Sequence, residues 1–259
     1  MRSGCRTGGR RDKPSGRRYV CPRPLRLRWP SPLKPPPTLV FDLDGTLVDT
    51  ADDLLATLNV VLRSEGMRPV QRSDAIAMVG RGSRVLIESA FASEGRALTA
   101  ATLDRLLMAF LAYYDAHIVD QSRLYPGAQE ALDRCAAAGW RLAVCTNKFE
   151  APARKLLSLL GVAEMFAAIT GQDTFGFRKP DPRHLTETIR LAGGNPADAV
   201  MVGDSATDVE TARAAHVPVI AVTFGYSAVP VASLNATRVI DRFSELYPTV
   251  RGLTLGPPT

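Results

Sequence analysis

From residue 38 onward, short apolar and β-branched runs alternate with segments in which apolar positions have helical spacing. The runs predict strands at Thr38–Phe41, Arg141–Cys145, Ala167–Thr170, Ala199–Val202 and Pro218–Thr223, with a weaker sixth at Arg238–Ile240. Helices are predicted between them, near Ala151–Leu160, Arg183–Ala192 and Asp208–Ala215. This alternation favours an α/β fold in which helices cover both faces of a doubly wound parallel sheet.

The interval from about Asp52 to Leu124 breaks this alternation, because it shows helical patterning and no strand candidate. Two apolar faces are predicted, one formed by Leu54, Leu55, Leu58, Val61 and Leu62 and the other by Leu103, Leu106, Leu107, Phe110, Leu111 and Tyr114. Thr50 and Asp53 have the spacing of a capping box that would open the first helix. We therefore predict a helical domain at 52–124, inserted into an α/β core formed by 38–51 and 125–259.

Composition separates the first 37 residues from the rest of the 259-residue chain. They hold 11 of the 32 lysines and arginines, one acid (Asp12) and eight of the 19 prolines, which predicts a disordered basic extension. The remainder carries 21 basic and 25 acidic residues, so the overall charge of +6 comes from the extension. Such an extension could attract nucleic acid or an anionic membrane. We favour an extension without a function and expect no nucleic-acid partner.

Cysteine usage and hydropathy argue against several classes of protein. The four cysteines form no CxxC pair, so neither a zinc site nor a disulfide framework is indicated. No apolar run is long enough to span a bilayer, and no apolar stretch follows the first arginines as in a secretory signal. We expect a cytoplasmic monomer or homodimer with no membrane partner.

Polar side chains follow the predicted strands where each strand ends. These segments are Asp42-Leu43-Asp44-Gly45-Thr46, Thr146-Asn147-Lys148 and Gly203-Asp204-Ser205-Ala206-Thr207-Asp208, with Arg178-Lys179-Pro180 before the fourth strand. The carboxyl ends of parallel strands meet at one edge of a sheet. Four acids gathered there would repel one another without a cation, and oxygen ligands favour Mg²⁺. Lys179 and the Thr146 hydroxyl would then serve a phosphoryl group. Taken singly, each segment could instead be a solvated strand end, a surface turn or a helix N-terminus.

The motifs DLDGT, CT, RKP and GDSATD occur in the order found in the haloacid dehalogenase superfamily, which the chain resembles over residues 38–246. The resemblance implies a Rossmann-like doubly wound parallel sheet with an inserted helical cap domain at 52–124. It also implies a Mg²⁺-dependent enzyme. Dehalogenases of the superfamily lack the second aspartate, so Asp44 favours phosphate chemistry. Sugar-phosphate mutases carry a cap histidine where this chain has Leu54, which favours hydrolysis.

The same resemblance implies a role for each site residue. Asp42 would be the nucleophile that forms an aspartyl-phosphate, and Asp44 would be the general acid and base. Asp204 would bind Mg²⁺ together with Asp42 and the Asp44 carbonyl. Lys179 would neutralise the phosphoryl group and the nucleophile. The remaining positions would bind substrate (Thr146, Asn147, Lys148) or support the site (Gly45, Thr46, Asp208).

The segments "CTNK" and "RKPDPRHL" further resemble bacterial phosphoglycolate phosphatases. Arg81, in the predicted cap loop Val79–Leu86, could pair with a small carboxylate or be a solvated turn residue. We predict a phosphatase acting on a small-molecule phosphate ester, with 2-phosphoglycolate as the leading candidate. Two alternatives stay open: a phosphatase of the same superfamily acting on pyrophosphate or a sugar phosphate, and a nucleic-acid-binding protein acting through its basic extension.

Overall fold

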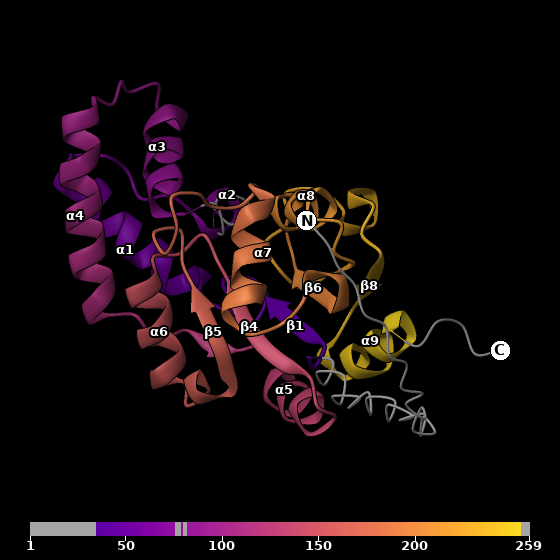
Figure 1. Ribbon diagram of the computed structural model, residues 1–259. Coiled ribbons are helices and arrows are strands. Elements are labelled where there is room, and N and C mark those ends of the chain that lie inside the picture. Colours follow the sequence, from indigo (N-terminus) through magenta and orange to yellow (C-terminus); the bar gives the residue numbers. More distant parts are fainter. Residues whose placement is uncertain (1–34, 76–78, 80–81, 255–259) are drawn as a thin grey trace, which may run out of the picture. The chain divides into compact units, whose positions relative to one another are not determined.

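The computed structural model describes residues 35–75, 79 and 82–254 (Figure 1). The predictions for the basic extension up to residue 34 and for Arg81 therefore lie outside the described residues. The strands of the main sheet are β1 (Thr38–Phe41), β4 (Arg141–Cys145), β5 (Phe166–Thr170), β6 (Ala199–Gly203), β7 (Val219–Val222) and β8 (Arg238–Ile240). Each of the six predicted strands is confirmed, with bounds that differ by no more than one residue.

The sheet has the order β5-β4-β1-β6-β7-β8, and all neighbouring strands are parallel. Side chains alternate between its two faces. On one face, Leu39 and Phe41 of β1 pack into a core with α5 (Ala128–Ala137), α6 (Glu150–Leu159) and α9 (Leu246–Thr254).

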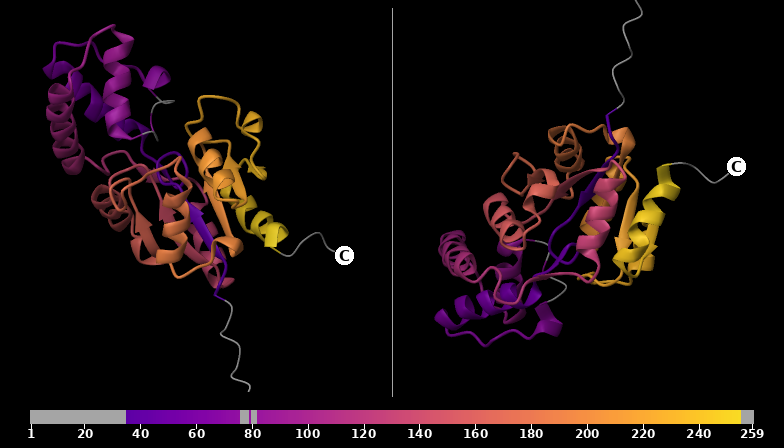
Figure 2. Two further views of the ribbon diagram at one scale, coloured as in Figure 1. Left: turned by 45° about the horizontal axis from the view of Figure 1, so that its top comes forward. Right: turned by 90° about the horizontal axis from the view of Figure 1, so that it is seen from below.

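On the other face, Val40 packs into a second core with α7 (Pro182–Leu191) and α8 (Ala206–Ala214). Figure 2 shows these helices on both sides of the strands. The doubly wound α/β fold is confirmed. The sequence patterns predicted α6, α7 and α8 within two residues, but they did not predict α5 or α9.

The inserted segment contains α1 (Ala51–Ser64), α2 (Arg72–Ala75), α3 (Ser83–Ser93) and α4 (Ala100–Ala116). Here α4 packs against both α1 and α3, and most of the predicted apolar faces are buried between these helices. The prediction that 52–124 holds no strand is wrong at its end. Val48–Asp49 (β2) and Arg123–Leu124 (β3) form an antiparallel pair, which is too short to show an alternating pattern.

The predicted capping box at the start of α1 is also wrong. Thr50 is the N-cap residue, but its side chain makes no capping hydrogen bond. Its hydroxyl donates to Asp44 Oδ1 at 2.8 Å. The Asp53 carboxylate accepts hydrogen bonds from the backbone N–H groups of Gln121 and Ser122, which follow α4. The side chains of Thr50 and Asp53 therefore form hydrogen bonds with residues outside α1 and do not cap its first turn.

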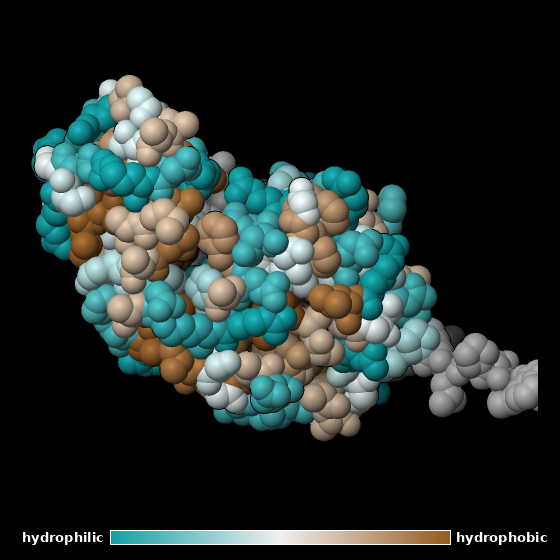
Figure 3. All heavy atoms as spheres, turned by 60° about the vertical axis from the view of Figure 1, so that its left-hand side comes forward, coloured by the Kyte–Doolittle hydropathy of each residue, from teal (hydrophilic) through white to brown (hydrophobic). Residues whose placement is uncertain are grey.

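The helices that the structure describes include none with the length and apolar character needed to cross a membrane. On the face shown in Figure 3, hydrophilic residues surround small groups of apolar ones.

Candidate active site

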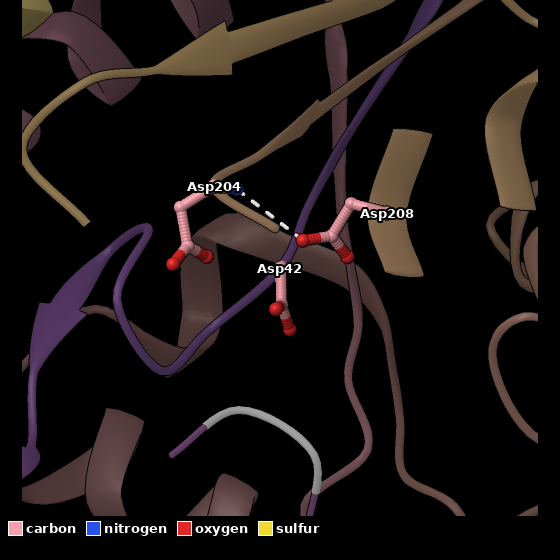
Figure 4. Close-up of side chains that lie close together, drawn as sticks. All are labelled: Asp42, Asp204 and Asp208. Atoms are coloured by element: carbon pink, nitrogen blue, oxygen red, sulfur yellow. Dashed lines mark hydrogen bonds between the residues drawn. The ribbon is translucent and has the colours of Figure 1, made fainter. Parts of the chain in front are cut away.

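Three aspartates from two distant segments meet at the carboxyl edge of the sheet. Asp42 directly follows β1, Asp204 directly follows β6, and Asp208 lies in the first turn of α8. We call these three residues the acidic cluster. One carboxylate oxygen of each lies within 4.8 Å of the others, and the residues are 2%, 2% and 0% exposed (Figure 4).

Lys179 supplies a positive charge to the acidic cluster. Its Nζ lies 2.9 Å from Asp42 Oδ1 and 2.6 Å from Asp208 Oδ1, and its side chain is 1% exposed. With every group ionised, three carboxylates face one ammonium, which leaves two negative charges in a buried site. A divalent cation fits this charge and this set of hard oxygen ligands.

Burial raises the pKa of Asp42 to about 8, although Lys179 opposes the shift. Burial and the charge of Asp208 raise the pKa of Asp204 to about 7. Without a cation, these carboxyl groups therefore tend to hold protons near neutral pH.

The two oxygens of Asp42 differ in their contacts. Oδ1 accepts a hydrogen bond from the backbone N–H of Leu43 at 2.7 Å, and it also faces Lys179. Among the described residues, no hydrogen bond reaches Oδ2. One oxygen of Asp42 is thus held in place while the other is free to react or to bind a cation.

Asp208 is fully engaged with its own surroundings. Its Oδ2 accepts from the backbone N–H groups of Asp204 and Ser205 and from the Ser205 hydroxyl, while Oδ1 faces Lys179. Ser205 and Asp208 also form the capping box of α8. These contacts fit a residue that orients Lys179 and the loop carrying Asp204 better than they fit a direct metal ligand.

Asp204 is oriented by contacts to both of its oxygens. The Thr46 hydroxyl donates to Oδ1 at 2.8 Å, and the backbone N–H of Tyr226 donates to Oδ2 at 2.7 Å. Gly45 allows the Asp204 carboxylate to lie this close to the loop, since the chain turns there with φ of +83° and a Cβ would lie 2.6 Å from Asp204 Oδ2.

Asp44 does not join the acidic cluster. Its carboxylate pairs with Lys148 Nζ, at 2.8 Å from Oδ1 and 3.1 Å from Oδ2, and Oδ1 also accepts from Thr50. The expectation that four acids crowd around one cation therefore needs correction. The structure gathers three, and Asp44 has a counterion of its own that lies 104 residues away in the chain.

Thr146 and Asn147 directly follow β4. The Thr146 oxygen accepts a hydrogen bond from the backbone N–H of Lys148, which leaves its O–H available to donate. The Asn147 side-chain N–H donates to the backbone carbonyl of Lys179, and its Oδ1 is buried without a partner in the described part of the chain. Both residues are nearly fully buried.

A pocket between the helical insertion and the sheet edge lies next to Asp44. Its walls are mostly apolar or aromatic, from the residues Leu54, Val79, Leu86, Phe110, Leu111, Tyr114, Phe149 and Pro152. Gly82 and Ser83 also line the pocket. Among the described residues that line it, the charged ones are Asp44 and Lys148.

The sequence analysis missed one residue that connects much of this site. The Tyr226 hydroxyl accepts from the backbone N–H groups of Thr50 and Ala51, and it donates to Asp49. Its own backbone N–H binds Asp204. The position of Gly225-Tyr226 after the fifth predicted strand was the available signal, but nothing local indicates contacts with residues some 176 positions away.

Comparison with known proteins places the chain among related hydrolases. Residues 39–222 match the family model described as haloacid dehalogenase-like hydrolase. The chain is 53% identical over 210 residues to a protein of Mesorhizobium japonicum and 49% identical over 214 residues to one of Agrobacterium fabrum. Both proteins are named phosphoglycolate phosphatase, and each alignment covers 92% of the relative, with 81% and 83% of this chain.

Solved structures agree on the fold. A predicted phosphoglycolate phosphatase from Haemophilus somnus superimposes with a TM-score of 0.77 at 27% identity, covering 84% of this chain and 99% of the other. A putative phosphoglycolate phosphatase from Lactobacillus delbrueckii gives a TM-score of 0.76 at 27% identity, covering 82% and 97%.

Proposed function

Because the chain belongs to the haloacid dehalogenase-like hydrolases, we propose that it is a Mg²⁺-dependent phosphatase that converts 2-phosphoglycolate to glycolate and phosphate. The names of its relatives support a phosphoric monoester hydrolase and point to this substrate. The observation that carries the proposal is the position of Asp42 Oδ2, which accepts no hydrogen bond from the described residues and lies in a buried acidic cluster with Lys179 in contact with Oδ1.

The cation is assigned to the acidic cluster. Asp42 and Asp204 would bind it through their side chains, and Asp44 would contribute its backbone carbonyl. When bound, Mg²⁺ would offset negative charge on the carboxylates and on the phosphoryl group. The net charge of the buried cluster supports this assignment.

The first chemical step is assigned to Asp42. Its Oδ2 forms a bond to phosphorus as the bond between phosphorus and the ester oxygen breaks, which gives an aspartyl-phosphate. Lys179 holds Oδ1, so the carboxylate keeps one orientation. The Thr146 hydroxyl and the Asn147 segment would bind the non-bridging oxygens, where donors stabilise developing charge.

Asp44 is assigned both proton transfers. It donates a proton to the departing alkoxide, and it then takes a proton from the water that attacks the aspartyl-phosphate. The second step releases inorganic phosphate and restores the Asp42 carboxylate. The pocket beside Asp44, with Lys148 in its wall, would hold the glycolate part of the substrate.

Asp42→Asn tests the assignment of the nucleophile. We expect the variant to lose phosphoglycolate hydrolysis and the acid-stable trapping of label from [³²P]-substrate, because an amide oxygen does not form the acyl phosphate. Asp133→Asn is the matched control, since Asp133 is an exposed acid on α5. Hydrolysis retained by Asp42→Asn would defeat the mechanism, and a screen in which wild-type protein prefers pyrophosphate or a sugar phosphate would defeat the substrate.

A further inference from the structure

Lys148 is a buried cation whose partner is the residue assigned to proton transfer. It is 8% exposed, and its Nζ contacts both oxygens of Asp44. The same Nζ lies 4.6 Å from the centre of the Tyr114 ring, which is also buried. Lys148 and Asp44 therefore form a buried ion pair.

The ion pair between Lys148 and Asp44 conflicts with the proton transfers assigned to Asp44. To protonate a leaving oxygen, Asp44 must carry an O–H and direct it at that oxygen. In the structure Lys148 donates to both Asp44 oxygens, and Thr50 donates to one of them. While both Asp44 oxygens accept from Lys148, neither can carry an O–H directed at the leaving oxygen, because the oxygen that carries the proton must give up its contact with the ammonium. The two-oxygen contact with Lys148 must therefore be broken before Asp44 can transfer a proton.

The pocket indicates what opens it. Lys148 is the cation that faces this pocket among the residues described, and the rest of the wall is uncharged apart from Asp44. An anionic group on the leaving part of the substrate would enter mostly apolar surroundings, where an unpaired charge is costly. Among the described residues the counterion for such a group is Lys148, so the substrate and Asp44 would compete for one ammonium.

We propose that Lys148 makes this enzyme specific for phosphate esters with an anionic leaving group, because the substrate carboxylate draws Lys148 away from Asp44 and thereby releases Asp44 for proton transfer. The inference rests on the proposed function, and it adds the reason for substrate choice. Lysine suits this role, since its long flexible side chain can change partners without movement of the backbone. An ester with an uncharged leaving group binds without breaking the pair.

The mechanism predicts a difference in kcat as well as in KM. A residue that merely binds the carboxylate would change KM for an uncharged ester and leave kcat alone. Here the uncharged ester also leaves Asp44 paired, so its kcat falls. We expect wild-type enzyme to prefer 2-phosphoglycolate over 2-hydroxyethyl phosphate by at least about 100-fold in kcat/KM, with at least about tenfold of that in kcat.

Lys148→Met tests the assignment directly. We expect the preference to shrink to about tenfold or less, with a higher kcat on 2-hydroxyethyl phosphate, since Asp44 is then free. Lys155→Met is the control, because Lys155 is a partly exposed cation on α6 paired with Asp115, and it should keep the wild-type preference.

Three results would overturn the inference. The first is a Lys148→Met variant that loses activity on both esters in equal proportion. The second, which needs no variant and holds even if Lys148→Met does not fold, is a wild-type enzyme whose two esters differ in KM alone. The third is a wild-type enzyme that uses both esters equally well. In each case aspartyl-phosphate trapping at Asp42 would persist, whereas its absence with every phosphate ester would instead refute the proposed function.

Discussion

Tyr226→Phe should destabilise the protein strongly although it removes a single oxygen atom. The Tyr226 hydroxyl accepts from the backbone N–H groups of Thr50 at 2.7 Å and Ala51 at 2.9 Å, and it donates to Asp49 Oδ1 at 2.6 Å. Tyr226, Thr50 and Ala51 are all buried, so water does not readily replace the lost oxygen.

The magnitude follows from these contacts. The Thr50 N–H would be left without an acceptor, which costs about 1–3 kcal/mol for a buried donor. The Ala51 N–H keeps a long contact of 3.4 Å to Asp49, so its loss is smaller. The bond to Asp49 contributes about 1 kcal/mol, since that carboxylate is partly exposed and stays paired with Arg72. We expect a loss of about 3 kcal/mol in the free energy of unfolding, or roughly 6–12 °C in melting temperature for a chain of this size.

Urea unfolding in the presence of a chelator measures this loss. Tyr247→Phe is the matched control, because the Tyr247 ring contacts Arg134 and Arg251 while its hydroxyl takes part in no hydrogen bond among the described residues. The backbone N–H of Tyr226 still reaches Asp204 in the variant, so Mg²⁺ binding should be retained. A Tyr226→Phe variant within about 0.5 kcal/mol of wild type, or a control that loses as much, would refute the reasoning.

Two further predictions concern the acidic cluster. The pKa values of about 8 for Asp42 and about 7 for Asp204 mean that, between about pH 4 and 8, the metal-free folded chain keeps protons that the unfolded chain has released. The stability due to these groups therefore falls as pH rises through that window, and Mg²⁺, which replaces the protons, should raise the melting temperature more at pH 8 than at pH 6. An equal Mg²⁺-induced shift at both pH values would contradict this. A Cβ at Gly225 would lie 2.2 Å from Asp204 Cβ and 2.4 Å from the Gly45 carbonyl oxygen, so Gly225→Ala should weaken Mg²⁺ binding by at least about tenfold in calorimetric titration. Gly252→Ala, where a Cβ meets nothing within 4 Å, should bind Mg²⁺ as wild type does, and equal affinities in both variants would show that close packing at Gly225 is not needed.

The main sheet could be predicted because its strands are buried on both faces and read as continuous apolar runs. The strand Ala199–Gly203, for example, is buried at every position. The pair β2–β3 could not be predicted in this way, since two residues carry no period. The helix Ala128–Ala137 was missed, because the left-handed conformation of Gly127 that precedes it is visible in the structure and not in the sequence.

The positions of the site motifs could be predicted, but the partners of their side chains could not. The rule that strand ends share an edge correctly places Asp42 and Asp204 together. It says nothing of Lys148, whose contact with Asp44 depends on how the segment after β4 turns. Thr50 and Asp53 match a local capping pattern, yet their side chains bond to Asp44 and to the segment after α4. Local patterns do not include the competition from residues brought close by the fold.

The pairing of β2 with β3 has a consequence for how this family could diversify. Val48 lies opposite Leu124 and Asp49 opposite Arg123, so the chain leaves the sheet edge and returns to it at neighbouring points. Insertions are tolerated where the two junctions are close, because the host fold need not stretch to accept them. Residues 50–122 could therefore be exchanged for the corresponding segment of a relative as a single cassette, which would change the helical wall of the pocket while Lys148 and the acidic cluster, which lie outside that segment, stay in place.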